Sequence, residues 1–253
     1  MKSINKSLIN TTWAACLLGV AALSINTANA GTITTGCVSP TTCTLAELFG
    51  GGSMQVTNAT SGYLYNNFFL EQLIADPSVN LSLITVTGTS VTGNLGIQIS
   101  GNGQLAVTNT DSIALDLSYT SVAVPVNGGI HGAFGSGLVI DGSVTGSGFI
   151  NVTDAIFYQG ATLIGSLNTI IDPAYGEDKR SDIGYYIGYK DPCSYDPKLI
   201  CIEKNIRVSG RASGDSANLT SIIQESIPEP ATISLLGWGV VGLWLSKRRH
   251  SNA

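Results

Sequence analysis

The sequence predicts an all-β protein: an antiparallel β-sandwich of the jelly-roll or immunoglobulin-like kind with one short helix near its start. Residues 113–120 (IALDLSYT) alternate between apolar and polar side chains, as expected for a strand that is buried on one face. Similar short runs recur along the chain, separated by turns rich in Gly, Asn and Ser such as TGNLG, SGNGQ and TGSGF. Many short strands at this spacing favour a sandwich or a barrel.

The first expected element of the body is the helix, within residues 44–49 (TLAELF). Thr44 can cap its first turn while Glu47 reaches back to the Thr44 amide, which is the capping-box arrangement. Leu45, Leu48 and Phe49 would then lie on the sheet. The expected strands are, in chain order, 54–57, 64–70, 81–87, 95–99, 105–108, 113–120, 138–144, 149–157, 199–211 and 219–224.

Residues 1–30 have the three parts of a secretory signal peptide. Lys2 and Lys6 form a positive start, residues 13–25 are an apolar stretch that would be helical, and Ala28-Asn29-Ala30 is a small-x-small cleavage site. The chain is therefore predicted to pass through the secretion machinery and to be cut by signal peptidase, so that the mature protein begins at Gly31.

Four of the five cysteines remain after removal of the signal peptide: Cys37, Cys43, Cys193 and Cys201. An even number of cysteines in an exported chain suggests two disulfides. Three pairings are possible, and the spacing favours the local pairs Cys37–Cys43 and Cys193–Cys201. A zinc site is the weaker interpretation, because the spacings are longer than those of zinc knuckles and the compartment is oxidising.

The charge of the expected body, residues 31–227, excludes nucleic acid as a partner. No Lys or Arg occurs between Ser7 and Asp178, and all basic residues of the body lie between Lys179 and Arg211. The net charge of this body is −9, from seven basic and sixteen acidic residues. Binding to phosphates requires clustered cations, so such a body should be repelled by nucleic acid and by anionic membrane surfaces.

Residues 172–203 differ in composition from the rest of the body. They hold three of the eight prolines and five of the nine tyrosines of the chain. We interpret this segment as a bridged insertion or flap on the sandwich, which is either a solvated loop or a recognition surface. In the second case Tyr185, Tyr186 and Tyr189 offer large amphipathic contact areas, for example to an extracellular polysaccharide.

No catalytic constellation is recognisable, so we expect no enzyme, no cofactor and no metal site. The body has a single histidine, His131, in a glycine-rich turn, and no GxSxG motif. Residues 237–242 spell GxGxxG, but they lie inside an apolar run without the strand and crossover that a dinucleotide site requires. One enzymatic alternative stays open, a carboxylate-based hydrolase. Its acids would come from Asp111, Asp116, Asp141 and Asp154, although Asp116 should point outward and the others border turns.

The last residues form an ordered series of three features. Pro228-Glu229-Pro230 precedes an uncharged stretch, 231–246, and the basic cluster Lys247, Arg248 and Arg249 follows it. As a helix, residues 231–246 would span about 24 Å, against about 30 Å for the hydrocarbon core of a bilayer. This predicts a short transmembrane helix, with the basic cluster holding the C-terminus in the cytoplasm by the positive-inside rule.

This series resembles the PEP-CTERM sorting signal of bacterial exported proteins. The resemblance implies that an exosortase recognises residues 228–253 and cuts near Pro228-Glu229-Pro230, after an inner-membrane intermediate. The body would then reach the cell surface or the extracellular matrix, as in biofilms. LFGGGSMQV (48–56), NNFF (66–69), NLGIQISG (94–101) and residues 203–224 also resemble segments of the β-sandwich bodies of such proteins. The bridged insertion departs from them, as does Thr57-Asn58, which stands where a Gly-Asp is usual.

The sequence as a whole therefore predicts an exported, disulfide-stapled β-sandwich that acts as a non-enzymatic surface or matrix component. A secreted carbohydrate-binding module is the alternative, and the carboxylate-based hydrolase is the weaker one.

Overall fold

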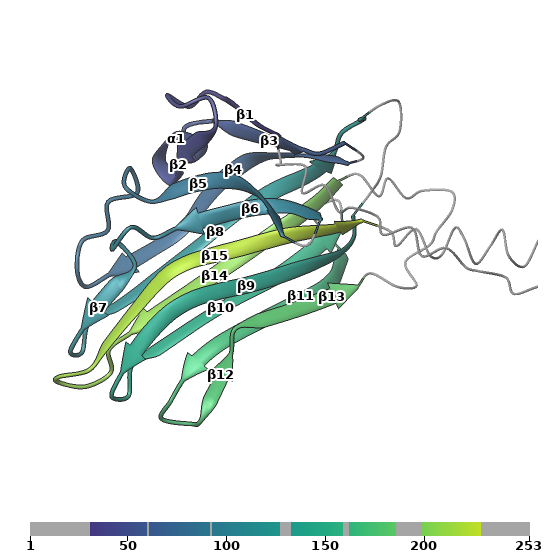
Figure 1. Ribbon diagram of the computed structural model, residues 1–253. Helices are drawn as coiled ribbons and strands as arrows, with labels where there is room; N and C mark the ends of the chain where they lie inside the picture. The colour runs from purple at the N-terminus through teal and green to yellow at the C-terminus, as the bar shows by residue number, and fades with distance from the viewer. Residues whose placement is uncertain are drawn as a thin grey trace, which may run out of the picture.

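The computed structural model describes residues 31–59, 61–91, 93–126, 133–158, 162–185 and 199–228. The predicted signal peptide, 1–30, and the predicted transmembrane stretch, 231–246, lie outside these ranges. Two antiparallel sheets and one short helix make up the described chain (Figure 1).

The first layer, which we call sheet A, has eight strands in the order β1-β3-β4-β8-β14-β10-β11-β12. Their bounds are β1 Gly31–Thr35, β3 Ser53–Thr57, β4 Gly62–Ala75, β8 Ser112–Ala123, β14 Leu199–Ser209, β10 Phe149–Tyr158, β11 Thr162–Asp172 and β12 Glu177–Lys179. The second layer, sheet B, has seven strands, six of them in the order β13-β9-β15-β6-β5-β2, with β7 paired to β15. Their bounds are β13 Ser181–Tyr185, β9 Ala133–Thr145, β15 Ser216–Pro228, β6 Asn94–Ser100, β5 Thr85–Val91, β2 Thr42–Thr44 and β7 Ala106–Thr108.

The predicted β-sandwich is therefore confirmed at the level of two packed antiparallel sheets. The alternation of 113–120 is the inward and outward alternation of β8, whose odd-numbered residues are buried and whose even-numbered residues are half-buried. The inner faces of both sheets form one core of aliphatic residues with Tyr63, Tyr65, Phe68 and Tyr119. Because burial of each large apolar side chain contributes about 1.5–3 kcal/mol, this interface is the main source of stability.

Helix α1, Leu45–Phe49, has the predicted capping box. The Glu47 amide donates to the Thr44 hydroxyl at 3.2 Å, and the Thr44 amide donates to the Glu47 carboxylate at 2.7 Å. Backbone amides of Thr44 and Val38 hold the pKa of Glu47 below its usual range. Leu45 and Leu48 are fully buried, and Phe49 packs against the core, as expected.

The structure contains strands that the sequence analysis did not predict: β1, β2, β11, β12 and β13. In β11 the alternation is blurred, because the polar Thr169 points inward and is fully buried while Ile170 on the other face is half-buried. β12 is exposed along its whole length and therefore has no apolar pattern. The expected strand 81–87 begins later, at Thr85, because residues 81–83 form a turn.

Part of the predicted insertion, 172–203, belongs to the two sheets. β12 lies at the edge of sheet A and β13 at the edge of sheet B, so this piece of chain crosses from one layer to the other. The Asn168 amide of β11 donates to the Asp182 carboxylate of β13 at 2.8 Å, which ties the two edges together. This finding differs from the flap that we expected from composition: residues 177–185 close one side of the sandwich. Residues 186–198 lie outside the described ranges.

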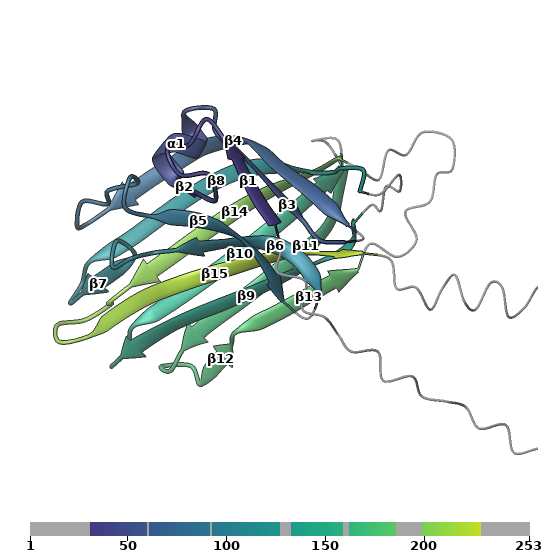
Figure 2. The same cartoon turned by 45° about the horizontal axis from the view of Figure 1, so that its top comes forward.

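The described chain begins and ends at the same end of the sandwich (Figure 2). Gly31 pairs with Thr57 at this end of sheet A, and Pro228 pairs with Ala133 in sheet B. We call this the terminal end. The opposite end, which we call the far end, carries the short turns around residues 109–111, 146–148, 173–176 and 210–215.

Candidate functional site

The predicted sorting residues are described only at their first position. Pro228 is the last residue of β15 and still pairs with β9. Glu229, Pro230 and the basic cluster Lys247, Arg248 and Arg249 lie outside the described residues. The folded body therefore leads into the predicted sorting signal directly from a strand of sheet B.

The predicted disulfide between Cys37 and Cys43 is present. It closes a small loop in the connection between β1 of sheet A and β2 of sheet B, since Cys37 lies in this connection and Cys43 lies in β2. Cys201 lies on β14 and forms no disulfide with another described residue, and burial together with the neighbouring Glu203 and Glu71 raises the pKa of its thiol. Its predicted partner Cys193 is outside the described residues, so the second disulfide stays a prediction.

The tyrosines proposed as ligand contacts lie mostly beyond the described ranges. The backbone of Tyr185 ends β13 at the terminal end, while Tyr186 and Tyr189 fall in the segment 186–198. Tyr175 of the same predicted insertion is described: it lies in a turn at the far end with 77% of its surface exposed.

A cluster at the far end holds this turn in place. Arg211 makes two hydrogen bonds to the buried Asp172 carboxylate, at 2.9 and 2.7 Å. Its guanidinium lies 4.6 Å from the centre of the Phe149 ring and 5.5 Å from that of Tyr175. Arg211 has a φ of 70°, a left-handed conformation that is costly for a residue with a side chain. The bidentate pair and the ring contacts offset this cost.

A groove of about 420 Å³ lies beside the same turn. It is lined by Gly142, Ser143, Val144, Ile171, Pro173, Gly176, Glu177, Asp178 and Arg180. Of these lining residues, Arg180 donates to the Gly142 carbonyl at 3.0 Å and to the Asp178 carboxylate at 2.7 Å. The groove thus combines a cation, two acidic residues and backbone surface next to the exposed Tyr175 ring.

The four aspartates considered for a hydrolase do not come together. Asp116 lies on the outer face of sheet A, where Arg207 binds its carboxylate, and Asp141 is exposed on β9 near Arg180. Asp111 lies in a turn at the far end. Asp154 was expected to border a turn, which is wrong: it lies within β10 and is 1% exposed. These four residues therefore supply no pair of facing carboxylates.

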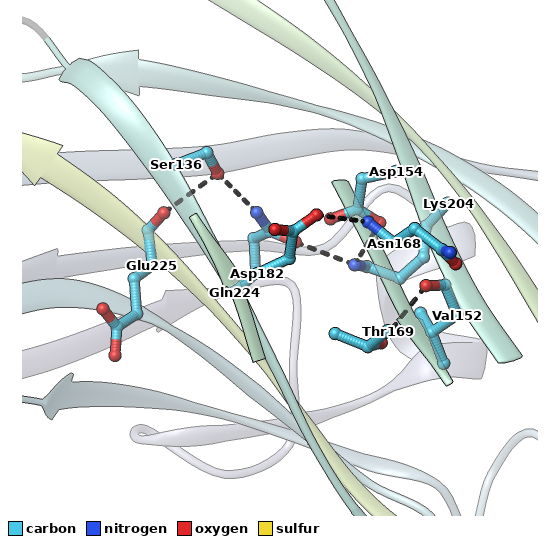
Figure 3. Close-up of polar contacts among 9 residues, drawn as sticks. All are labelled: Ser136, Val152, Asp154, Asn168, Thr169, Asp182, Lys204, Gln224 and Glu225. Atoms are coloured by element: carbon cyan, nitrogen blue, oxygen red, sulfur yellow. Dashed lines mark hydrogen bonds and ion pairs between the residues drawn. The ribbon is translucent and has the colours of Figure 1, made fainter. Parts of the chain in front are cut away.

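Asp154 instead belongs to a buried polar cluster between the two sheets, which we call the Lys204 cluster (Figure 3). It consists of Asp154 and Lys204 from sheet A and Gln224 and Ser136 from sheet B. The Lys204 amine is 2.5 Å from Asp154 Oδ1 and donates to Gln224 Oε1 at 2.8 Å. The Gln224 amide donates to Ser136 Oγ at 2.5 Å, and Ser136 donates to the Glu225 carbonyl at 3.0 Å.

Lys204 and Asp154 are direct cross-strand partners on β14 and β10, and both side chains are fully buried. Their nearest neighbours along and across the strands are buried aliphatic residues: Val152, Ile156, Ile202, Ile206, Leu117 and Leu167. Burial raises the pKa of the Asp154 carboxyl against the opposing effect of Lys204. Burial likewise lowers the pKa of the Lys204 amine against the effect of Asp154. Both shifts favour the uncharged forms.

The backbone around Gln224 is packed closely enough to fix its position. A Cβ atom added to Gly96 of β6 would lie 2.0 Å from the Gln224 carbonyl oxygen, so only glycine allows this approach. Gln224 is 1% exposed, and its side chain reaches the amine of Lys204 from the opposite layer. The cluster therefore links the two sheets at the centre of the core.

Sequence reasoning missed this cluster although a signal was present. In β14 the inward positions read Ile200, Ile202, Lys204, Ile206 and Val208, and in β10 the inward positions Ile150, Val152 and Ile156 flank Asp154. A charged residue in phase with buried aliphatic neighbours on both sides is predicted to point into the core. Two such interruptions of opposite charge predict two buried charged residues, although not that these residues are partners.

Comparison with known proteins adds no further assignment: no protein family, curated protein or solved structure matches this chain significantly. Within the described ranges, no group of three or more His, Cys, Asp and Glu side chains is arranged to hold a metal ion. Nor does this part of the chain contain a helix with the length and apolar character needed to cross a membrane.

Proposed function

We propose that the protein is an exported, non-enzymatic component of the cell surface or extracellular matrix, sorted by an exosortase through residues 228–253. The observation that carries this proposal is the ordered series of Pro228-Glu229-Pro230, an uncharged apolar stretch and a terminal basic cluster. The secretory features of residues 1–30 support it. A chain with an N-terminal signal peptide and a C-terminal apolar stretch followed by basic residues is expected to be translocated until the apolar stretch is retained in the membrane.

Processing at the two predicted cleavage sites is compatible with the described fold. The first described strand begins at Gly31 and the last described strand ends at Pro228. Removal of residues 1–30 and of the chain after Pro230 would therefore delete no described strand. Since both ends lie at the terminal end of the sandwich, the far end would face away from the membrane while the tail is still inserted.

Intact-mass analysis of the protein from a host with and without exosortase tests this proposal. We expect Gly31 as the N-terminus in both hosts, and loss of the chain after the Pro-Glu-Pro region only where exosortase is present. Replacing Pro228, Glu229 and Pro230 together by Ala should leave residues 231–253 attached in the competent host. A mature wild-type protein that retains residues 231–253 in that host would contradict the proposal.

A second candidate function, carbohydrate binding, is favoured by the exposed Tyr175 beside the groove at the far end. Its ring is held by Arg211, and the adjacent groove offers charged and polar groups to hydroxyls. On this proposal the Tyr175→Ala variant loses retention on the host's extracellular polysaccharide, while Tyr175→Phe retains it because the ring face remains. Equal retention of wild type and Tyr175→Ala would exclude Tyr175 as the contact.

A further inference from the structure

We propose that Lys204 and Asp154 form an intramolecular isopeptide bond, a covalent amide that joins β14 to β10 in the core of the sandwich. The inference is independent of the sorting signal and rests on the geometry of the Lys204 cluster. In that cluster an amine and a carboxyl group from directly paired residues approach to 2.5 Å with no exposure to solvent (Figure 3).

The first requirement for such a bond is that the amine and the carboxyl group are uncharged, because an ammonium has no lone pair and a carboxylate resists attack. The surroundings of the pair are aliphatic on both strands and across them. In such surroundings a charge is costly, and transfer of a proton from the ammonium to the carboxylate removes both charges without changing the net charge of the protein. The same burial that disfavours the ion pair therefore produces the reactive forms.

The second requirement is a fixed approach of the nucleophile. The Lys204 amine donates one hydrogen to Gln224 Oε1, and Gln224 is held in turn by its hydrogen bond to Ser136. With that hydrogen engaged from sheet B, the amine is held against Asp154 on sheet A. Gln224 is thus a positioning residue, and a reacting pair held in contact gains a large advantage over separate molecules.

The reaction balances without any co-reactant. The lone pair of Lys204 Nζ attacks Cγ of the protonated Asp154 carboxyl group and forms the C–N bond. The bond from Cγ to the protonated oxygen then breaks, and this oxygen leaves as water with its own proton and one proton from the amine. The other amine proton stays on the amide nitrogen, and no atom is oxidised or reduced.

The oxygens of Asp154 fit this scheme. Oδ1 faces the amine, whereas Oδ2 is buried and accepts no hydrogen bond from the described residues. A buried carboxylate oxygen without a partner is costly, so this pair is poorly satisfied as a permanent ion pair. Formation of the amide expels one of the two carboxyl oxygens as water and leaves a single neutral acceptor, whose burial costs less than that of a carboxylate.

Peptide mapping of the exported wild-type protein tests the proposal directly. The protein is unfolded, reduced, alkylated and digested with trypsin, which does not cut after an acylated lysine. We expect the peptide Leu199–Lys204 to be absent. Residues 199–207 should instead remain attached to the long fragment that ends at Lys179 and contains Asp154. The mass of this product should equal the sum of the masses of peptide 199–207 and the long fragment, less one water.

Lys204→Arg is the matched control, because it keeps the positive charge and the trypsin site but removes the nucleophilic amine. This variant should release the peptide from Leu199 to position 204 and leave the long fragment unmodified. Gln224→Leu should lower the cross-linked fraction of the wild-type pair, while Gln224→Glu, which keeps an acceptor oxygen, should restore it. Recovery of free Leu199–Lys204 from the wild type in the same yield as other tryptic peptides would overturn the proposal.

Discussion

Replacing Lys204 with Met is expected to lower the free energy of unfolding by about 5–7 kcal/mol, because it removes the cross-link, worth about 4 kcal/mol, and leaves a buried carboxyl that costs about 1–3 kcal/mol more. Met has a similar length and is apolar, so the variant fills the space of the lysine stem. The variant leaves the Asp154 carboxyl fully buried among aliphatic residues and without the amine of Lys204. Chemical denaturation followed by far-ultraviolet circular dichroism measures the change.

The double variant Lys204→Met with Asp154→Leu separates the two contributions to this loss. It removes the isolated carboxyl, so it should regain about 1–3 kcal/mol relative to Lys204→Met alone. It does not regain the cross-link, however. For residues 50 positions apart, closing the loop covalently in the unfolded chain is worth about 4 kcal/mol. A double variant as stable as the wild type would indicate an ordinary buried pair and contradict the cross-link.

Arg211→Ala is expected to lower the free energy of unfolding by about 2–3 kcal/mol, because it leaves the buried Asp172 carboxylate without its bidentate partner. The side chain of Asp172 is 3% exposed, so water replaces the guanidinium poorly. The variant also removes the cation that lies over Phe149. The loss is measured by the same denaturation experiment at neutral pH.

Arg211→Gly is the control for the backbone contribution. It loses the same side chain, but glycine adopts the φ of 70° at position 211 without strain, so this variant should be about 1 kcal/mol more stable than Arg211→Ala. Arg211→Lys keeps the charge but not the planar guanidinium that binds the carboxylate through two hydrogen bonds. Its free energy of unfolding should lie between those of the wild type and the glycine variant. An alanine variant as stable as the glycine variant would show that the backbone of Arg211 is not strained.

The alternation of apolar residues predicted the fold class because each sheet has one buried face. Thus β8 and most of the longer strands were recognised from their period of two. β12 could not be recognised in this way, since all three of its residues are exposed and its pairing depends on β11, a strand that the sequence analysis also missed. The helix was predictable for another reason: Thr44 and Glu47 satisfy each other within a few residues, so no distant contact is required.

The Lys204 cluster could be predicted only in part. The phase of Lys204 and of Asp154 within their strands is a local property that the sequence contains. That the two residues are partners is not a local property, because it requires β10 and β14 to be neighbours in the sheet. These strands are separated in the chain by β11, β12 and β13. Gln224 is still less predictable, since it reaches Lys204 from the other sheet and depends on how the layers are stacked.

The strand order also sets when the protein can fold. β14 lies between β8 and β10 in sheet A, and β15 lies between β9 and β6 in sheet B, although both strands come last in the chain. A chain that emerges from its N-terminus therefore cannot complete either layer until almost all of it has been made. Its earlier strands lack their central neighbours until then, and we expect such an incomplete chain to stay unfolded, as passage through a narrow protein-conducting channel would require. If the chain is exported as proposed, the late central strands would keep it from completing its fold until translocation is nearly finished.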